Sequence, residues 1–124
     1  MSVRSYLCWQ IRLVGEIMEK EIEQIDFAKG DGIVPVIVQD ANSKQILTLA
    51  YTNKESLEMT KKTGNSWFWS RSRNKLWMKG EESGNTQKVK EILVDCDSDA
   101  LIYLVEPSGP ACHTGQGTCF HNKM

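Results

Sequence analysis

The chain has 124 residues, a net charge of −1 and a charged fraction of 25%, which is the profile of one ordinary soluble globular domain. The near-neutral charge gives no field toward nucleic acid or a membrane surface, and no apolar run approaches the roughly 20 residues of a membrane helix. We therefore expect a single cytoplasmic domain over residues 1–124, with residues 1–30 as a poorly defined N-terminal extension.

The first half of the chain predicts a short helix, a hairpin and a longer helix. Residues 16–28 have apolar positions for one face of a short amphipathic helix. Residues 31–40 and 44–52 are β-rich runs separated by a turn composition, which predicts a hairpin. Residues 52–64 predict a helix that Asn53 caps and Gly64 ends. Leu57 and Thr60 would face its core.

The second half predicts strands followed by an irregular tail. The strands are expected over residues 66–70, 87–97 and 100–106, with a tight reversal between the last two. After Pro107 the chain is rich in glycine. The pattern predicts an α+β fold, mostly antiparallel β sheet, curled or barrel-like, with one main helix.

Three cysteines in the second half form a candidate zinc site, whereas Cys8 lies far from them. Thiolates favour zinc over magnesium or calcium, and three protein ligands leave the fourth position for water, as in catalytic zinc sites. The candidate ligands are Cys96, Cys112 and Cys119. Gly115 and Gly117 would let the loop fold back. A closed structural site that adds His113 is the alternative.

The stretch "DCDSDA" at residues 95–100 sets carboxylates beside a thiol. In extended chain Asp95, Asp97 and Asp99 would share one face and Cys96 the other, which predicts a magnesium site beside a zinc site. The alternative is a solvated acidic turn, because aspartate and serine favour turns. His113, next to a cysteine, is a candidate proton shuttle, and a structural hydrogen bond is its alternative role.

The stretch at residues 66–85 interleaves basic and aromatic side chains. Guanidinium groups bind phosphate and tryptophan offers a flat face to a base, so we predict a nucleotide or phosphate site here. Its candidate residues are Arg71, Arg73, Lys75, Trp77, Lys79, Ser83 and Asn85. The alternatives are a platform for single-stranded nucleic acid and a plain strand pair with aromatic residues inside and charges outside.

Three motifs in a fixed order resemble the phosphoribosyl-AMP cyclohydrolase family of histidine biosynthesis. They are "SRSRNKLWMKGEESGNTQKV", "DCDSDA" and "GPACHTGQGTCF". The resemblance runs from about Ile33 to Phe120 and rests on the ordered set rather than on one motif. Thr118 stands where the family usually has serine. We expect no fused pyrophosphohydrolase domain.

The resemblance implies hydrolysis of the bond between N1 and C6 in the adenine ring of phosphoribosyl-AMP, which gives a formimino-carboxamide ribotide. It implies that zinc-bound hydroxide is the nucleophile, with zinc on Cys96, Cys112 and Cys119. It also implies assisting magnesium on Asp95, Asp97 and Asp99. It further implies an intertwined homodimer whose zinc site is shared between chains. The alternative function is a non-enzymatic structural zinc module that binds nucleic acid through residues 67–79, against which the net charge of −1 argues.

Overall fold

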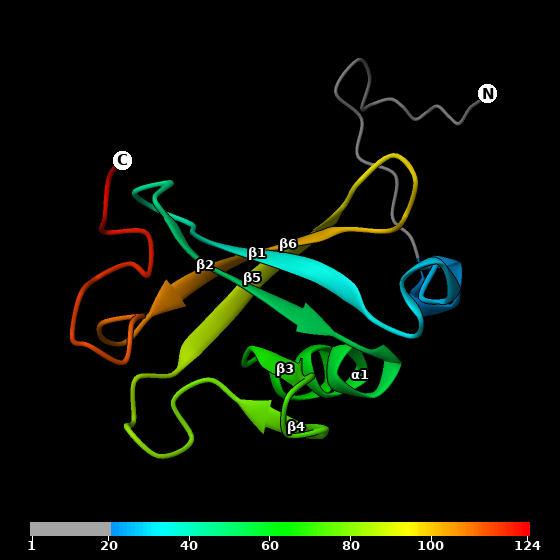
Figure 1. Ribbon diagram of the computed structural model, residues 1–124, viewed down its shortest axis with the longest axis horizontal. Helices are drawn as coiled ribbons and strands as arrows, with labels where there is room; N and C mark the ends of the chain where they lie inside the picture. Colours follow the sequence, from blue (N-terminus) through cyan, green and yellow to red (C-terminus); the bar gives the residue numbers. More distant parts are fainter. Residues whose placement is uncertain (1–20) are drawn as a thin grey trace.

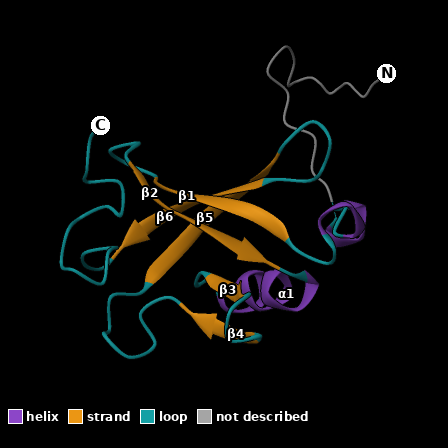
Figure 2. Cartoon of the chain, in the orientation of Figure 1, coloured by secondary structure: helices purple, strands orange, loops and turns teal. Residues whose placement is uncertain are grey.

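The computed structural model describes residues 21–124, which fold around a four-stranded sheet and one α-helix (Figure 1). In chain order the elements are η1 Ile22–Gln24, η2 Ala28–Gly30, β1 Val34–Asp40, β2 Ile46–Thr52, α1 Lys54–Thr63, β3 Trp67–Ser70, β4 Lys75–Met78, β5 Gln87–Val94 and β6 Leu101–Pro107. The helix and the β3–β4 pair lie under one face of the larger sheet (Figure 2). The predicted α+β class, with one main helix, is confirmed.

The larger sheet has the strand order β2-β1-β6-β5, and β3 and β4 form a separate two-stranded sheet. The predicted hairpin is confirmed, since β1 pairs with β2 antiparallel. β5 and β6 are also antiparallel, whereas β1 and β6 run parallel. The expectation of a barrel-like sheet is wrong for the described residues, because both sheets are open. In the four-stranded sheet β2 and β5 are the edge strands, and the β3–β4 pair does not close the gap between them.

Helix α1 begins and ends where the sequence predicts. The Asn53 side chain accepts a hydrogen bond from the backbone N–H of Ser56 at 2.8 Å, which caps the first turn. Gly64 follows the last turn with φ 81°, a left-handed conformation that costs glycine little. Leu57 and Thr60 are buried, as predicted. The helix therefore covers the sheet with the expected face.

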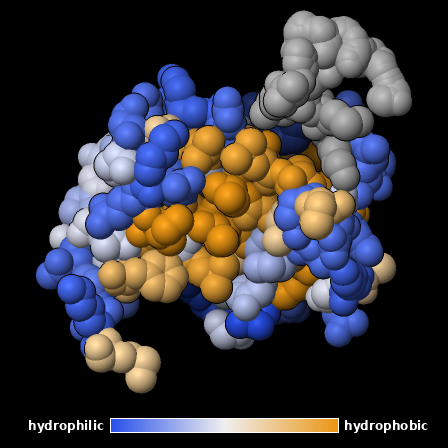
Figure 3. Space-filling view, turned by 90° about the horizontal axis from the view of Figure 1, so that it is seen from above, coloured by the Kyte–Doolittle hydropathy of each residue, from blue (hydrophilic) through white to orange (hydrophobic). Residues whose placement is uncertain are grey.

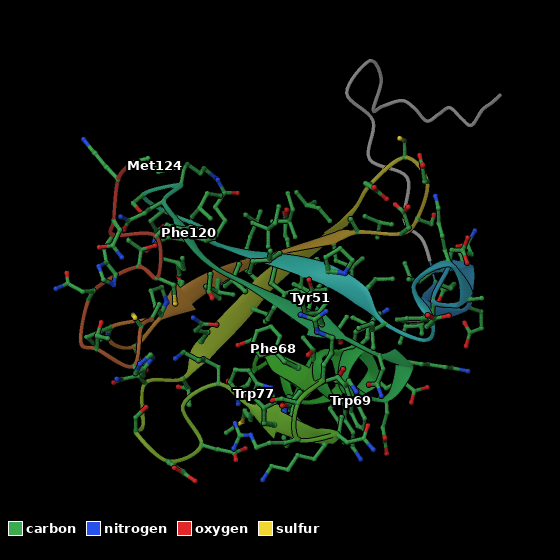
Figure 4. All side chains as sticks on the ribbon, viewed as in Figure 1. Tyr51, Phe68, Trp69, Trp77, Phe120 and Met124 are labelled. Atoms are coloured by element: carbon green, nitrogen blue, oxygen red, sulfur yellow. The ribbon has the colours of Figure 1, made fainter. Side chains whose placement is uncertain are left out.

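The core lies between the sheet, the helix and the β3–β4 pair. Alternate residues of β1 and β6 point inward, and Val36, Val38 and Tyr103 are fully buried. The Phe68 ring from β3 stacks on Tyr103, with 5.9 Å between ring centroids. Trp77 from β4 packs on the same Phe68 ring at 5.0 Å, beneath the sheet (Figure 4). The β3–β4 pair is thus fastened to the core by its aromatic side chains.

The helix predicted over residues 16–28 is wrong for its described part. Residues 21–30 form the two 3-10 turns η1 and η2 instead. The backbone N–H of Asp26 donates to the carbonyl of Ser98 at 2.7 Å, a partner outside the segment, so it is not available for a helical bond. Residues 16–20 lie outside the described residues. In residues 21–124 we find no helix long and apolar enough to cross a membrane.

Candidate functional site

The turn at residues 95–100 joins β5 to β6 and is closed by one of its own carboxylates. The Asp95 side chain accepts from the backbone N–H groups of Asp99 at 2.9 Å and Ala100 at 3.3 Å. Ser98 has φ 61°, so the chain reverses here rather than running extended. The expectation that the three aspartates share one face of extended chain is therefore wrong, while the predicted tight reversal is confirmed.

Cys96 and Asp97 point toward each other instead of to opposite faces. The thiol donates to Oδ1 of Asp97, with 2.9 Å between the atoms. This hydrogen bond, and then the charge of the same carboxylate, raises the pKa of Cys96 above its ordinary value. Because an exposed thiol beside carboxylates resists ionisation, Cys96 is a neutral thiol near pH 7.

A lysine from η2 lies beside the other two carboxylates of the turn. Lys29 Nζ is 2.7 Å from Asp99 Oδ2 and 3.5 Å from Asp97 Oδ2. The hydrogen bond from Lys29 is the main cause that lowers the pKa of Asp99. The sequence offered no signal for this contact, since Lys29 lies in the segment assigned to the extension. The turn therefore already holds one positive charge between two of its aspartates.

The cysteine loop, residues 110–121, lies at the other end of β6 and is fastened to β2. The backbone N–H of Cys119 donates to the carbonyl of Leu47 at 2.7 Å, and the Thr118 hydroxyl donates to the carbonyl of Ile46 at 2.6 Å. Gly115 has φ 93°, which permits the reversal predicted for this loop. The loop brings the Cys119 side chain to Cys112, as expected.

Cys112 has the opposite electrostatic setting to Cys96. Hydrogen bonds from the Thr114 hydroxyl, at 3.1 Å, and from the Thr114 backbone are the main causes that lower the pKa of Cys112 to about 6. His121 contributes through its Nε2, which lies 3.9 Å from the Cys112 sulfur. The sequence analysis missed His121, because a residue near the chain end carries no spacing signal. His113 is exposed.

The three predicted zinc ligands do not meet within one chain. Cys96 precedes β6 and Cys112 follows it, and the seven residues of that strand span about 20 Å at roughly 3.3 Å per residue. Figure 1 shows the β5–β6 turn and the C-terminal segment at opposite ends of the sheet. In residues 21–124 no three histidine, cysteine, aspartate or glutamate side chains are grouped so that they could hold a metal ion. The closed site with His113 is therefore not formed within the chain.

The basic residues of the candidate phosphate site gather on the β3–β4 hairpin. Arg71, Arg73 and Lys75 are exposed there, and the Arg71 guanidinium lies 3.9 Å from the centroid of the Tyr51 ring. Trp77 faces the core rather than solvent, which matches the plain strand pair. The hairpin thus offers cations to an anion, but Trp77 is committed to packing.

Lys79, Ser83 and Asn85 lie on the segment between β4 and β5. The backbone N–H of Lys79 donates to the carbonyl of Ser66 at 3.0 Å, which anchors the start of the segment. The Ser83 hydroxyl accepts from the backbone N–H of Asn85 at 3.2 Å. Further on, Thr86 is hydrogen-bonded to Ser108. Ser83 and Asn85 therefore lie at the same end of β6 as Cys112.

A cavity of about 920 Å³ lies between η1, α1 and β5. Its apolar walls include Ile22, Leu57 and Val89, and its charged rim includes Lys61 and Lys90. None of the predicted metal, catalytic or substrate-binding residues lines it. The candidate metal ligands and His113 lie instead at the two ends of β6, and the basic candidates lie on the β3–β4 hairpin.

Comparison with known proteins identifies the family. The phosphoribosyl-AMP cyclohydrolase family model (PRA-CH) matches residues 48–121, a span that contains the turn, the hairpin and the cysteine loop. The chain is 76% identical over 107 residues to "Phosphoribosyl-AMP cyclohydrolase" of Nitrosopumilus maritimus, covering 86% of this chain and 99% of that protein.

More distant relatives carry the same name or a longer architecture. The chain is 53% identical over 107 residues to "Phosphoribosyl-AMP cyclohydrolase" of Clostridium botulinum, covering 86% of this chain and 97% of that protein. It is 62% identical over 101 residues to "Histidine biosynthesis bifunctional protein HisIE" of Bacillus subtilis, covering 82% of this chain and 48% of that protein. The chain belongs to the phosphoribosyl-AMP cyclohydrolase family, a family of hydrolases in histidine biosynthesis.

Proposed function

We propose that this cyclohydrolase opens the adenine ring of phosphoribosyl-AMP at a zinc site built by two copies of the chain. Cys96 of one protomer and the partner subunit's Cys112 and Cys119 would hold the metal. The observation that carries this proposal is the position of the cysteines at opposite ends of β6, within a chain whose family match covers all three. The donor set also fits, because thiolates and zinc are soft or borderline partners.

The outer face of the larger sheet supports an interface with a second copy. Strand register aligns a row of aliphatic side chains across all four strands, namely Leu49, Ile37, Ile102 and Leu93. Ile37 is 37% and Leu49 49% exposed, so this face is uncovered in one chain. Figure 3 shows apolar residues gathered on the face seen from above, opposite to the helix. A contiguous apolar sheet face of this kind is typical of a surface that another protein covers.

Two-fold symmetry selects how the two faces must stack. If the axis ran along the strands, each Cys96 turn would lie over the partner's Cys96 turn. If it runs across the strands, each Cys96 turn lies over the partner's cysteine loop, and this happens twice per dimer. Sheets packed face to face lie roughly 10 Å apart, a gap that loops at the strand ends can bridge. The proposal therefore requires the second arrangement.

Within this site the side chains have distinct tasks. Zinc, when bound, lowers the pKa of water to about 7 and so supplies the nucleophile for C6. The ribosylated ring carries positive charge, which makes C6 electrophilic. As the bond from C6 to N1 breaks, C6 becomes the carboxamide carbon and N1 takes a proton as an amidine nitrogen. Exposed His113 is the group that we assign to this proton transfer.

The charged groups would hold the two phosphates and the second metal. Arg71, Arg73 and Lys75 are exposed cations suited to phosphate. Asp97 and Asp99 already share a cation in Lys29, so this pair suits a divalent ion, whereas Asp95 is occupied by backbone N–H groups. We propose that magnesium binds at this turn and links it to a substrate phosphate. No described feature favours the nucleic-acid module.

Subunit exchange between two inactive variants tests the shared site. Cys96→Ala and Cys112→Ala each spoil both sites of a dimer, but a mixed dimer has one site with both defects and one intact site. Random mixing should restore about a quarter of wild-type activity, as two-fold symmetry requires. The measurements are ring opening by ultraviolet absorbance and zinc content by mass spectrometry, with Cys8→Ser as the control that keeps both. Confirmed exchange without recovered activity would exclude the shared site.

A further inference from the structure

Asn85 lies in a slot whose two walls are glycines. A Cβ on Gly80 would stand 2.4 Å from the Asn85 carbonyl carbon and 2.5 Å from the Thr86 nitrogen. A Cβ on Gly109 would stand 2.3 Å from the Asn85 side-chain oxygen and 2.8 Å from its Cγ. Real Cβ atoms do not approach other atoms so closely. One glycine therefore admits the Asn85 backbone, and the other admits its side chain.

Hydrogen bonds close the slot from the side of the cysteine loop. Ser108 donates to the carbonyl of Thr86 twice, from its backbone N–H at 2.9 Å and from its hydroxyl at 2.9 Å. The same hydroxyl also lies 3.3 Å from the carbonyl of Gly84. The segment that carries Asn85 is thus tied to Ser108 and Gly109, which directly precede the cysteine loop.

The slot leaves the Asn85 amide with free donors. The side-chain oxygen faces Gly109, so the amide nitrogen lies on the other branch of the side chain, and its two N–H groups have no hydrogen-bond acceptor that we find in residues 21–124. Gly109 is three residues before Cys112 in the sequence. Asn85 and Cys112 thus lie at the same end of β6, and an amide donor held here is suited to a phosphate or ribose oxygen of a nucleotide bound at that end.

We propose that Gly109 is a positioning residue for the ring-opening reaction, and that it acts through Asn85. It leaves the space that aims the Asn85 amide at oxygen atoms of the nucleotide. This inference rests on the proposed function. It predicts that filling the space displaces the amide while the cysteines stay in place, because Gly109 itself contacts no sulfur among the nearest atoms of its added Cβ.

Gly109→Ala tests the steric part without backbone strain, because Gly109 is not among the glycines with positive φ. We expect kcat/KM to fall between about 10- and 100-fold, mainly through KM, the range in which small misplacements of substrate-orienting groups cost activity. Zinc content and dimer mass should not change. Gly30→Ala is the matched control, since no atom lies within 4 Å of its added Cβ.

A double-mutant cycle tests whether Gly109 acts through Asn85. In Asn85→Ala the nearest remaining atom of residue 85 is the Cβ, 3.4 Å from the added Cβ at position 109, so the clash disappears. Asn85→Ala alone should lower kcat/KM, and Gly109→Ala in that background should lower it no further. The double variant should also melt at the temperature of Asn85→Ala. These coupled results would support the inference even if Gly109→Ala alone failed to fold.

Three results would overturn the inference. Wild-type kcat/KM in a folded Gly109→Ala would do so, as would a loss of the same size in both backgrounds. An inactive wild-type enzyme with zinc bound would overturn the proposed function and this inference together. Melting temperatures distinguish a failure of this inference from a failure of the proposed function, because they measure the steric coupling between residues 85 and 109 without any turnover.

Discussion

The two ends of strand β6 present cysteines in opposite electrostatic settings. At the first end, Asp97 accepts a hydrogen bond from the Cys96 thiol and raises its pKa. At the second end, donors from Thr114 lower the pKa of Cys112 to about 6. Near pH 7 Cys96 is therefore a protonated thiol among carboxylates, whereas Cys112 is mainly a thiolate. The difference teaches that the two ends of one chain offer sulfur ligands in different protonation states, a contrast that the proposed shared zinc site would use.

Separating the two protomers of the proposed dimer should have the largest effect, because it parts the Cys96 turn of one chain from the cysteine loop of its partner. Ile37→Asp places a charge in the middle of the exposed apolar row, where it would be buried between two stacked sheets. We expect monomers in analytical ultracentrifugation and a loss of ring opening of at least about 100-fold, because a chain alone holds no complete ligand set. Lys54→Asp, at the exposed start of α1, is the control. A dimeric, active Ile37→Asp enzyme would exclude this face as the interface.

The two histidines of the cysteine loop are expected to have different roles: His113 in proton transfer, and His121 in lowering the pKa of Cys112. His113→Ala should lower kcat roughly 10²–10⁴-fold with zinc retained, as expected for the loss of a general acid or base. His121→Ala should have a smaller effect, because His121 contributes less than Thr114 to the lowered pKa of Cys112. Zinc content and turnover are measured together. Loss of zinc from His113→Ala would make that residue a ligand instead.

The carboxylates at the first end can be neutralised without changing their shape. Asp97→Asn and Asp99→Asn should each raise the magnesium concentration needed for half-maximal activity by about tenfold or more, with zinc still bound. Asp95→Asn should raise it less, because the Asp95 side chain accepts from the backbone N–H groups of Asp99 and Ala100 and would contribute only its charge to the site. Magnesium titrations of the purified variants measure this. Unchanged magnesium dependence in all three would leave the stretch as a solvated acidic turn.

The smallest effect is the difference in thiol ionisation itself. In metal-free protein, iodoacetamide should modify Cys112 with a midpoint near pH 6, because its lowered pKa keeps the thiolate above that pH. Cys96 should react only at a pH above the ordinary thiol range, since its pKa is raised. Asp97→Asn should move the Cys96 midpoint to lower pH and leave Cys112 unchanged. Peptide mass spectrometry distinguishes modification at Cys96 from modification at Cys112. Equal pH midpoints for the two cysteines would contradict the difference in their pKa values.

The sequence predicted the local parts of the fold well. Asn53 and Gly64 mark the ends of α1 because capping and left-handed glycine act within a few residues. The β1–β2 hairpin also follows from neighbouring residues. The parallel pairing of β1 with β6 and the open sheet could not be predicted in this way, since they depend on contacts between distant segments.

The candidate site was predictable in composition but not in arrangement. Alternation in extended chain placed Cys96 and Asp97 on opposite faces, whereas the chain turns in this stretch and the two side chains meet. The contacts of Lys29 with Asp99 and of His121 with Cys112 join groups that no motif spacing links. Such contacts arise from tertiary packing, which a single sequence does not display.

The cysteine loop also protects an edge of the sheet. β2 is an edge strand, and Thr118 and Cys119 take up the carbonyls of Ile46 and Leu47 at its start. An unpaired edge is a template on which another chain can add a strand. Release of this loop would free those carbonyls beside the exposed side chain of Ile46. Loss of the loop from β2 would then favour aggregation along that strand, so the contacts of Thr118 and Cys119 preserve the solubility of the protein apart from any role of the loop in the site.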